Sequence, residues 1–337
     1  MPMKKRALRV AGTGMTLPGR PVTAREIDAR AGLPEGWTAQ HSGVLTRHFS
    51  DGESAIQLGA RAVTEALRDA GLKLEDLDAI VSVSGTMHQP IPSNAALLAG
   101  ELGPGTEGMR TFDINSTCLG FLTGMDLVSA QLAAGSFRRA VLVASELASV
   151  GLDWTEAESC SILGDGAAAV IIEAVEPEAG GIGPGVAAAA FGTWARGAAL
   201  TEIRGGGSGQ PAGLWETSRP ADYLFHMDGR AVFKLAAELL PDFVRTLFSK
   251  HGFSWQDFDL IIPHQASLTS LALLRRRLGI PEERFMIYAQ DYGNTIAASI
   301  PMGLHLAMKS GRVKGGSRVL MIGTSAGFSL GALVLDL

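Results

Sequence analysis

A cysteine, a histidine and an asparagine are the residues of this sequence best suited to act together in chemistry. Cys118 lies in TFDINSTCLGF, between a strand-like run that ends near Asn115 and an apolar helix predicted over 118–135. The positive end of a helix dipole favours the thiolate, the nucleophilic form of cysteine. Gly120, two positions later, allows a close approach of backbone or substrate. Taken alone, Cys118 is better explained as an inert buried cysteine. Cys160 has no such setting and is interpreted as a packing residue of the core or near the surface.

His264 and Asn294 each follow a predicted element boundary. His264 comes after a short apolar strand in LIIPHQAS, and strand ends are where ligands collect in α/β sheets. Histidine titrates near neutral pH and therefore suits proton transfer. Asn294 opens a helix in DYGNTIAASIP, where an asparagine is most often a helix cap. Neither residue is decisive by itself, and each has a structural explanation.

An internal repeat connects the three residues. The segment 71–80 (GLKLEDLDAI) is echoed by 252–261 (GFSWQDFDLI), at an offset of 252 − 71 = 181 residues. The same order of predicted elements surrounds both segments. The matched pairs are the helices 54–70 and 231–250, the strands 79–83 and 260–263, the helices 118–135 and 294–311, the strands 138–145 and 317–325, and the glycine-started strands 164–173 and 327–337.

Alternating strands and helices predict a layered α/β fold of two similar halves. The strands are continuous apolar runs, as expected for a sheet covered on both faces. The predicted boundary lies near residue 175, giving an N-terminal half, 1–175, with Cys118 and a C-terminal half, 176–337, with His264 and Asn294. Cys118 and Asn294 start equivalent helices, so we expect the three side chains to converge at the seam. Chance resemblance between two ordinary strand–helix units is the alternative.

Composition excludes several classes of protein. The 337 residues are 46% hydrophobic and 19% charged, a balance opposite to that of a disordered chain. The net charge is −5 without a basic block, so nucleic acid is not an expected partner. No apolar run is long enough for a membrane span or a signal peptide, and two cysteines form no disulfide framework. We therefore expect a cytoplasmic protein.

Metal and nucleotide sites are not expected either. The seven histidines include no pair at the helix spacing typical of metal ligands beside a carboxylate. The glycines of 12–19 (GTGMTLPG) do not form G-x-G-x-x-G, and no helix follows them directly. The glycine-rich stretch 205–213 reads as a surface loop. No cofactor is predicted.

The Cys–His–Asn set on a duplicated α/β chain resembles the thiolase superfamily, and within it β-ketoacyl-acyl carrier protein synthase III. The resemblance covers nearly the whole chain and implies a five-layered αβαβα fold and a homodimer. The matching blocks are SGVLTRHF (42–49), IPSNAA (91–96), the Cys118 stretch, GDGAAAV (164–170), MDGRAVFK (227–234), PHQA (263–266), GNTIAASIP (293–301) and AGFSLGA (326–332).

The resemblance implies a decarboxylative Claisen condensation on carrier-protein or coenzyme A thioesters. Cys118 would take an acyl group from the donor, with the backbone N–H groups of Cys118 and Ala326 as the oxyanion hole. His264 and Asn294 would hydrogen-bond the carbonyl oxygen of a malonyl thioester and stabilise the enolate that decarboxylation leaves. The carbanion would then attack the acyl-cysteine and give a β-ketoacyl product.

Departures from the family pattern concern the donor. Trp37 matches the tryptophan that stacks on the adenine of coenzyme A. His41 and Ala157 stand where the two accompanying arginines are usual, which favours a carrier-protein donor. Ser267 replaces the usual asparagine after PHQA.

Other positions concern the acyl group. Ile91 replaces the phenylalanine of housekeeping members at the gate of the acyl pocket across the dimer, which implies a different acyl chain and a specialised-metabolism member. Ile91 also differs from the glutamate that stands at this position in relatives that join two fatty acyl chains. Phe233 is assigned to substrate binding.

Two other functions stay open from the sequence. The acyl group on Cys118 could pass to an alcohol or amine, with His264 as general base. The chain could also be a non-catalytic subunit that only binds carrier protein, although such subunits generally lose the nucleophile and this chain keeps all three residues.

Overall fold

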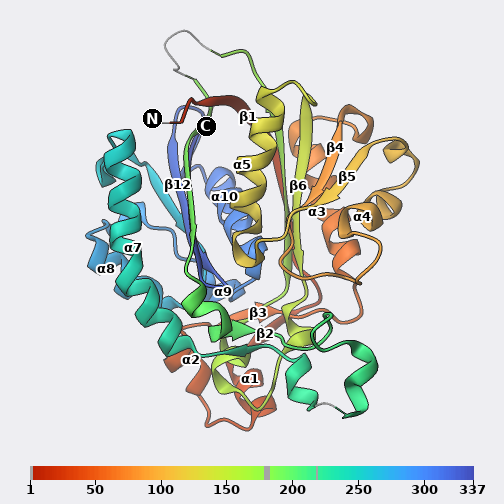
Figure 1. The fold of residues 1–337 in the computed structure, drawn as a ribbon, viewed down its shortest axis with the longest axis vertical. Helices are drawn as coiled ribbons and strands as arrows, with labels where there is room; N and C mark the ends of the chain where they lie inside the picture. Colours follow the sequence, from red (N-terminus) through yellow and green to blue (C-terminus); the bar gives the residue numbers. More distant parts are fainter. Residues whose placement is uncertain (1–2, 178–182, 218) are drawn as a thin grey trace.

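The computed structural model describes residues 3–177, 183–217 and 219–337, which form a layered α/β arrangement (Figure 1). Its large sheet contains β1 (Arg6–Thr16), β4 (Ala79–Ser82), β5 (Arg110–Asp113), β6 (Arg139–Glu146), β7 (Gly166–Ala174), β8 (Gly185–Thr193), β11 (Leu260–Pro263), β12 (Arg318–Ser325) and β13 (Ser329–Asp336). The strand order is β11-β12-β13-β8-β1-β7-β6-β4-β5.

The two sides of the sheet show the same sequence of strand pairings when each side is read toward the centre. On one side come β4, β6, β7 and β1, and on the other β11, β12, β13 and β8. The first pair is parallel on both sides, and the second pair is antiparallel on both sides. The repeated element order predicted from the sequence is thus present in space. The predicted boundary near residue 175 falls between β7 and β8, and 178–182 lie outside the described residues. That the halves are separate units stays a prediction.

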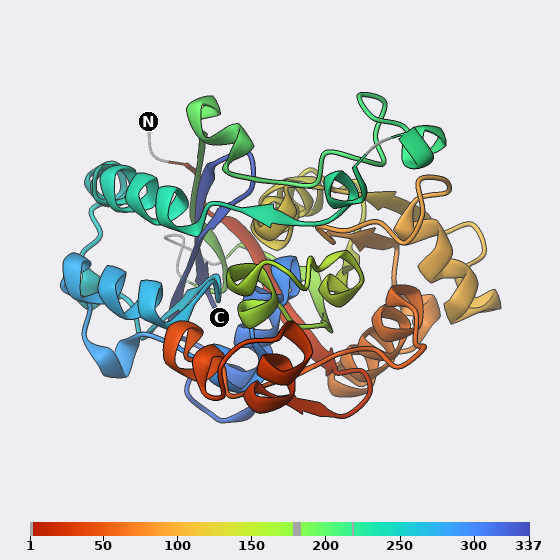
Figure 2. The ribbon, with the colours of Figure 1, turned by 90° about the horizontal axis from the view of Figure 1, so that it is seen from below.

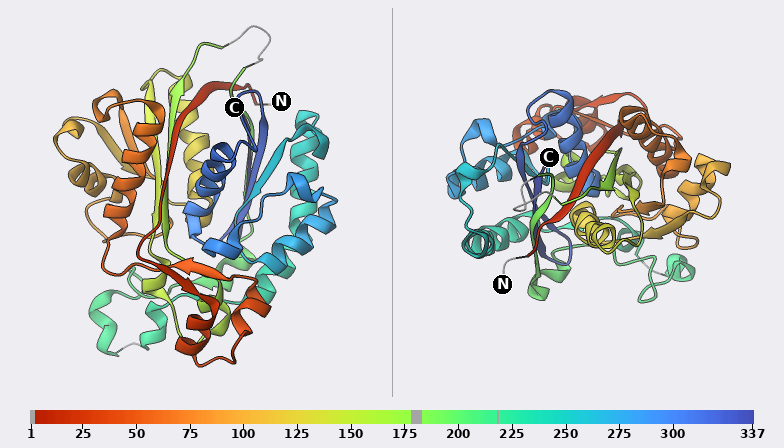
Figure 3. Two further views of the ribbon diagram at one scale, coloured as in Figure 1. Left: turned by 180° about the vertical axis from the view of Figure 1, so that it is seen from behind. Right: turned by 90° about the horizontal axis from the view of Figure 1, so that it is seen from above.

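Helices form three layers around the strands. The helices that matter here are α3 (Ala55–Ala70), α4 (Asn94–Leu102), α5 (Gly120–Ala133), α7 (Gly229–His251), α8 (Leu268–Leu278) and α10 (Ser299–Lys309). The helices α5 and α10 lie in the middle, with β6 and β12 on either side of them (Figure 1, Figure 3). The helices α3 and α4 cover one outer face and α7 and α8 the other (Figure 3). Because β1 and β8 pair only at Arg6–Val186 and Ala7–Gly185, the two sides of the large sheet lie in separate layers (Figure 3). The order helix, sheet, helix, sheet, helix is the five-layered arrangement expected.

The side chains of the inner strands alternate between two hydrophobic cores. In β6, Leu142 belongs to the central core around α5 and α10, whereas Val143 belongs to the outer core under α3. In β12, Met321 faces the central core and Leu320 the core under α7. All four side chains are fully buried. Burial on both faces explains why these strands are continuous apolar runs rather than alternating ones.

The segment 12–19 gave no strand prediction, yet its first part is in the middle of the sheet. Gly12 and Gly14 belong to β1, and α3 packs directly against them. A Cβ atom at Gly12 would lie 2.5 Å from the carbonyl oxygen of Ala66, and one at Gly14 would lie 2.1 Å from that of Ala62. These glycines therefore serve close helix–strand packing, and the polar Thr13 between them hid the strand from a hydrophobicity pattern.

Short elements cover one end of the layers, the end seen in Figure 2. They are α1 (Ala24–Ala31), α2 (Trp37–Ser42), α6 (Ala157–Ile162), α9 (Ala289–Tyr292) and the small strands β2 (Pro21–Thr23), β3 (Thr46–His48), β9 (Thr201–Glu202) and β10 (His226–Met227). Within the described ranges, no helix combines the length and apolar character that a membrane crossing requires.

A glycine pair tests the packing of α3 on β1. We expect Gly14→Ala to lower the free energy of unfolding by roughly 1–3 kcal/mol, because its Cβ would overlap the Ala62 carbonyl. Gly100→Ala is the matched control, since Gly100 lies in α4 with open space around it. It should be neutral or stabilise the fold by up to about 1 kcal/mol. Urea unfolding curves measure both changes, and equal losses would contradict this account.

Candidate active site

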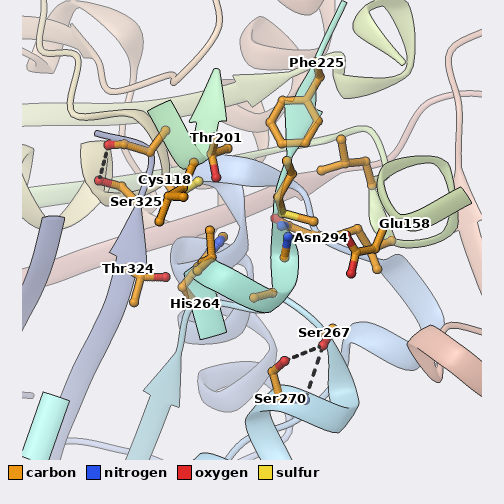
Figure 4. A pocket seen from close by; sticks show the side chains of 18 of the residues that line it. Cys118, Glu158, Thr201, Phe225, His264, Ser267, Ser270, Asn294, Thr324 and Ser325 are labelled. Atoms are coloured by element: carbon orange, nitrogen blue, oxygen red, sulfur yellow. Dashed lines mark hydrogen bonds between the residues drawn. The ribbon is translucent and has the colours of Figure 1, made fainter. Parts of the chain in front are cut away.

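Residues of both halves line a cavity of about 550 Å³ at the covered end of the layers. Cys118, His264 and Asn294 surround the same space in Figure 4. The structure therefore brings together the three residues that the sequence singled out. Trp37, Phe233 and Ala326, also predicted for the site, line this cavity as well. Ile91 does not line it, and its side chain is 83% exposed.

A tight turn places Cys118 at the head of α5. The side-chain Oδ1 of Asn115 accepts a hydrogen bond from the N–H of Thr117 at 2.8 Å. Thr117 has a φ of +46°, a conformation that a β-branched residue rarely adopts. A 3-10 turn over Thr117–Leu119 follows, and α5 starts at Gly120. A Cβ atom at Gly120 would lie 2.1 Å from the Val83 carbonyl oxygen, so only glycine lets α5 begin here.

The same turn recurs at the head of α10. The Oδ1 of Asn294 accepts a hydrogen bond from the N–H of Ile296 at 2.9 Å, and Ile296 has a φ of +49°. The 3-10 turn Ile296–Ala298 then leads into α10. The geometry corrects the sequence analysis in one respect, because Asn294 is equivalent to Asn115 rather than to Cys118. The equivalent of Cys118 is Ala297.

Backbone strain concentrates at this cavity. Within the described part of the chain, the non-glycine residues with positive φ are Thr117, Ile296 and Phe328, and all three line the cavity. Such conformations cost of order 1–3 kcal/mol each and cluster at functional sites. No residue type in the sequence announces them, since threonine and isoleucine are among the residues least suited to a left-handed conformation.

The thiol of Cys118 is protonated at rest. Burial, and secondly the charge of Glu146, raise its pKa to about 12, although the N–H groups of Cys118 and Ala326 hydrogen-bond to the sulfur and lower it. The expectation that the helix start favours the thiolate was therefore wrong for the resting protein, because desolvation of the sulfur outweighs the helix terminus. The N–H groups of Cys118 and Ala326 thus both lie beside Sγ.

His264 is buried and neutral. Its N–H donates to the carbonyl oxygen of Ile322 at 2.8 Å, which extends the pairing of β11 with β12. Its Nδ1 and the hydroxyl of Ser299 are hydrogen-bonded at 2.7 Å. Burial lowers the pKa of His264 to about 4, so the ring carries no charge at neutral pH. With Nδ1 engaged, Nε2 is the nitrogen available to a ligand in the cavity.

Ser299 is a site residue that the sequence analysis missed. It is fully buried in the first turn of α10, in a helix that is otherwise mostly apolar. A small polar residue in such a run is a weak signal, and only the fold shows that it faces His264. A serine hydroxyl that donates to Nδ1 leaves the proton of a neutral imidazole on Nε2.

Asn294 is held by main-chain hydrogen bonds from the other half. Its N–H donates to the Ile162 carbonyl at 2.7 Å, and its carbonyl accepts from the N–H of Gly164 at 3.0 Å. A Cβ atom at Gly164 would meet the Tyr292 carbonyl at 2.4 Å, so the two segments touch. Because Oδ1 is engaged by Ile296, the side-chain NH₂ of Asn294 is the group left for a ligand.

The outer part of the cavity carries carboxylates rather than basic groups. Trp37 and His41 stack with ring centroids 4.1 Å apart and planes 12° apart, and His41 Nδ1 is 2.8 Å from the Trp37 carbonyl oxygen. Glu158 and Glu202 belong to the lining, and none of its described members is Lys or Arg. Ala157, directly before Glu158 in α6, adds no charge. Nowhere among the described residues do three His, Cys, Asp or Glu side chains gather as a metal site.

Comparisons with known proteins agree along the whole chain. A family model of 3-oxoacyl-[acyl-carrier-protein (ACP)] synthase III matches residues 112–189, and the model of its C-terminal part matches residues 248–337. The β-ketoacyl-[acyl-carrier-protein] synthase III of a Ruegeria species is 33% identical over 334 residues, with 99% of each chain covered. That of Allorhizobium ampelinum is 34% identical, with 97% of this chain and 98% of the relative covered.

Solved structures share the fold. The 3-oxoacyl-[acyl-carrier-protein] synthase III of Aquifex aeolicus has a TM-score of 0.87 at 28% identity, over 98% of this chain and 100% of that one. The priming β-ketosynthase of the R1128 polyketide pathway has a TM-score of 0.87 at 27% identity, over 99% and 97%. These likenesses confirm the thiolase-like fold predicted from the sequence. The chain belongs to the 3-oxoacyl-[acyl-carrier-protein] synthase III family of acyltransferases.

Proposed function

We propose that this protein loads an acyl group onto Cys118 and condenses it with a malonyl thioester, with loss of CO₂. The observation that carries the proposal is the convergence of Cys118, His264 and Asn294 on one cavity, with two N–H donors at the sulfur. The named relatives are synthases of this type, and one solved neighbour is a polyketide priming enzyme. Action in the cytoplasm stays a prediction.

The first step is acyl transfer to the cysteine. Sγ of Cys118 attacks the carbonyl carbon of the donor, and the oxyanion of the tetrahedral intermediate accepts hydrogen bonds from the N–H groups of Cys118 and Ala326. The new S–C bond forms as the donor C–S bond breaks. The departing thiolate takes up the proton that the cysteine loses. A thiol with a pKa of about 12 must give up this proton as it attacks rather than beforehand.

The second step uses the neutral imidazole and the amide as hydrogen-bond donors. The C–C bond to the malonyl carboxylate breaks and releases CO₂, and the electron pair moves into an enolate. The enolate oxygen accepts from His264 Nε2–H and from the side-chain NH₂ of Asn294. The carbanion attacks the acyl carbon, the bond from that carbon to Cys118 Sγ breaks, and the released thiolate takes up a proton from solvent.

A hydrogen-bonding role suits His264 better than a role as general base. Burial lowers its pKa to about 4, so the imidazole is too weak a base to deprotonate an alcohol or amine efficiently at neutral pH. This favours carbon–carbon condensation over acyl transfer to oxygen or nitrogen. Acyl transfer to an alcohol or amine would instead appear as transfer from acyl-Cys118 without CO₂ release.

The two steps separate experimentally. Cys118→Ala should show no acyl adduct by intact-protein mass after incubation with acyl thioesters. His264→Ala and Asn294→Ala should still acylate, but lose at least about a hundredfold in CO₂ release from a malonyl thioester, because each removes an enolate hydrogen bond. Acylation without any CO₂ release in the unaltered protein would rule out the condensation. Retained transfer in Cys118→Ala would overturn the site assignment.

We infer that the donor is an acyl carrier protein rather than coenzyme A. His41 lies against Trp37, and Ala157 offers no cation to a nucleotide phosphate. The nearby carboxylate of Glu158 would repel such phosphates, whereas the charge of Glu202 is paired with Arg204. A carrier protein delivers the same pantetheine thioester without a nucleotide.

Arginines at both positions should restore use of coenzyme A. We expect the double variant His41→Arg with Ala157→Arg to acylate from coenzyme A thioesters at least about tenfold faster, and from carrier-protein thioesters much as before. The reason is that charge-assisted hydrogen bonds to phosphate contribute about 1.5–3 kcal/mol each. His41→Gln with Ala157→Gln is the uncharged control. An equal gain in the control would remove the electrostatic explanation.

We also propose that two copies form a homodimer in which Ile91 faces the partner's acyl pocket. Ile91 and Met87 are 83% and 64% exposed, which is costly for large apolar side chains close together on one loop. Contact with a partner would bury them, and the residue at position 91 would then limit the acyl chain.

Sedimentation tests this arrangement. The protein should sediment with the mass of two chains, and Ile91→Asp should shift it toward one chain or change the preferred acyl length. A single-chain mass at micromolar concentration would contradict the proposal. Val150, which is also strongly exposed, provides the control variant Val150→Asp.

A further inference from the structure

The carboxyl group of Glu146 is buried beside the nucleophile and has no part in the mechanism proposed above. Glu146 is the last residue of β6 and is fully buried. Its Oε1 accepts from the N–H of Gly85 at 2.6 Å. Its Oε2 accepts from the N–H of Thr86 at 3.1 Å and from the Thr86 hydroxyl at 2.6 Å. The N–H of Ala297 also hydrogen-bonds to it.

These partners come from two separate segments at the cavity. Gly85 and Thr86 line the cavity in the N-terminal half. Ala297 belongs to the turn before α10 and is the structural equivalent of Cys118. One carboxylate thus joins the end of β6, the wall at 85–86 and the turn that follows Asn294. A change at Glu146 would loosen contacts between the two halves at the point where the proposed catalytic residues meet.

The arrangement fits an ionised carboxylate. Every contact is a donor that points at an acceptor, and a carboxylate accepts four such bonds without a proton of its own. A glutamine would offer one acceptor oxygen and two donor hydrogens, which would face the N–H groups. Burial nevertheless raises the pKa of Glu146 to about 7, so the carboxyl is about half ionised at neutral pH and largely ionised above about pH 8. A buried charge without a paired cation is costly to hold.

The charge acts on the nucleophile. Glu146 is the charged group that raises the pKa of the Cys118 thiol, after burial itself. His264, which shares the cavity, is neutral at neutral pH and does not compensate this charge. The other titratable groups in the lining are His41, Glu158 and Glu202, and none of them shifts the Cys118 thiol. Alkylation and oxidation of cysteine both require the thiolate.

We propose that Glu146 is a positioning residue whose carboxylate fixes the cavity walls and, when ionised, adds to the burial that keeps Cys118 a thiol until an acyl donor is bound. The proposal rests on the proposed acyl-Cys118 chemistry. Acylation removes the repulsion between the Glu146 carboxylate and a Cys118 thiolate, because a thioester carries no charge. The N–H groups of Cys118 and Ala326 then bind the carbonyl oxygen of the thioester. The same carboxylate thereby protects the free enzyme without opposing the loaded one.

The test is the pH profile of Cys118 alkylation by iodoacetamide, followed by intact-protein mass in a Cys160→Ser background. We expect Glu146→Gln to lower the midpoint of alkylation by at least about one pH unit, and to speed labelling about tenfold at about pH 9, where Glu146 is ionised in the unaltered protein. Asp165→Asn is the matched control, because Asp165 is also fully buried and also accepts hydrogen bonds from backbone N–H groups, but does not line the cavity. It should leave the midpoint unchanged.

A second variant separates charge from position. Glu146→Asp keeps the charge on a shorter side chain, so its midpoint should stay within about half a unit of the unaltered protein while acyl transfer slows. It also serves if Glu146→Gln does not fold, since a midpoint that falls in Glu146→Asp would then overturn the electrostatic role. An unchanged midpoint in folded Glu146→Gln would overturn it directly. Labelling needs no acyl donor, so its failure is distinguishable from failure of the proposed condensation.

Discussion

The cavity depends on the main-chain hydrogen bonds that join Asn294 to the segment 162–164. The Asn294 N–H meets the Ile162 carbonyl, and the Gly164 N–H meets the Asn294 carbonyl. These bonds fix the turn before α10 against the N-terminal half, and thereby set where Asn294 and His264 lie relative to Cys118. The glycine at 164 is required because a side chain there would push the two segments apart. Reactive groups from distant parts of the chain are thus held by backbone rather than by side-chain contacts alone.

Much of the fold was predictable because both halves carry the same signals. Helix ends at Gly71 and Gly252 have φ of +66° and +72°, and the repeat found them at the offset of 181 residues. Apolar runs that alternate between two cores gave the buried strands. The middle strand β1 was not predicted because Gly12 and Gly14 are explained by close packing against the backbone of α3. The local sequence does not reveal that contact, since α3 lies far along the chain.

The site was predictable in its members and less so in its chemistry. Cys118, His264 and Asn294 stand at element boundaries that a pattern reveals. The pattern does not reveal the protonation states of Cys118 and His264, because these states follow from burial, which only the packed structure determines. Glu146 and Ser299 escaped for a related reason. A glutamate at a strand end and a serine at a helix start usually face solvent, and nothing local indicates that these two contact residues that line the cavity.

The paired turns at Thr117 and Ile296 carry a consequence for the history of the chain. Both halves keep the same strained turn, but the residues of the proposed catalytic set are divided between them. One copy holds a cysteine where the other holds Ala297, and Val83 occupies the place that corresponds to His264. Neither half can therefore replace the other. Once that division was made, the duplication became irreversible, because deleting either half removes an irreplaceable member of the proposed catalytic set.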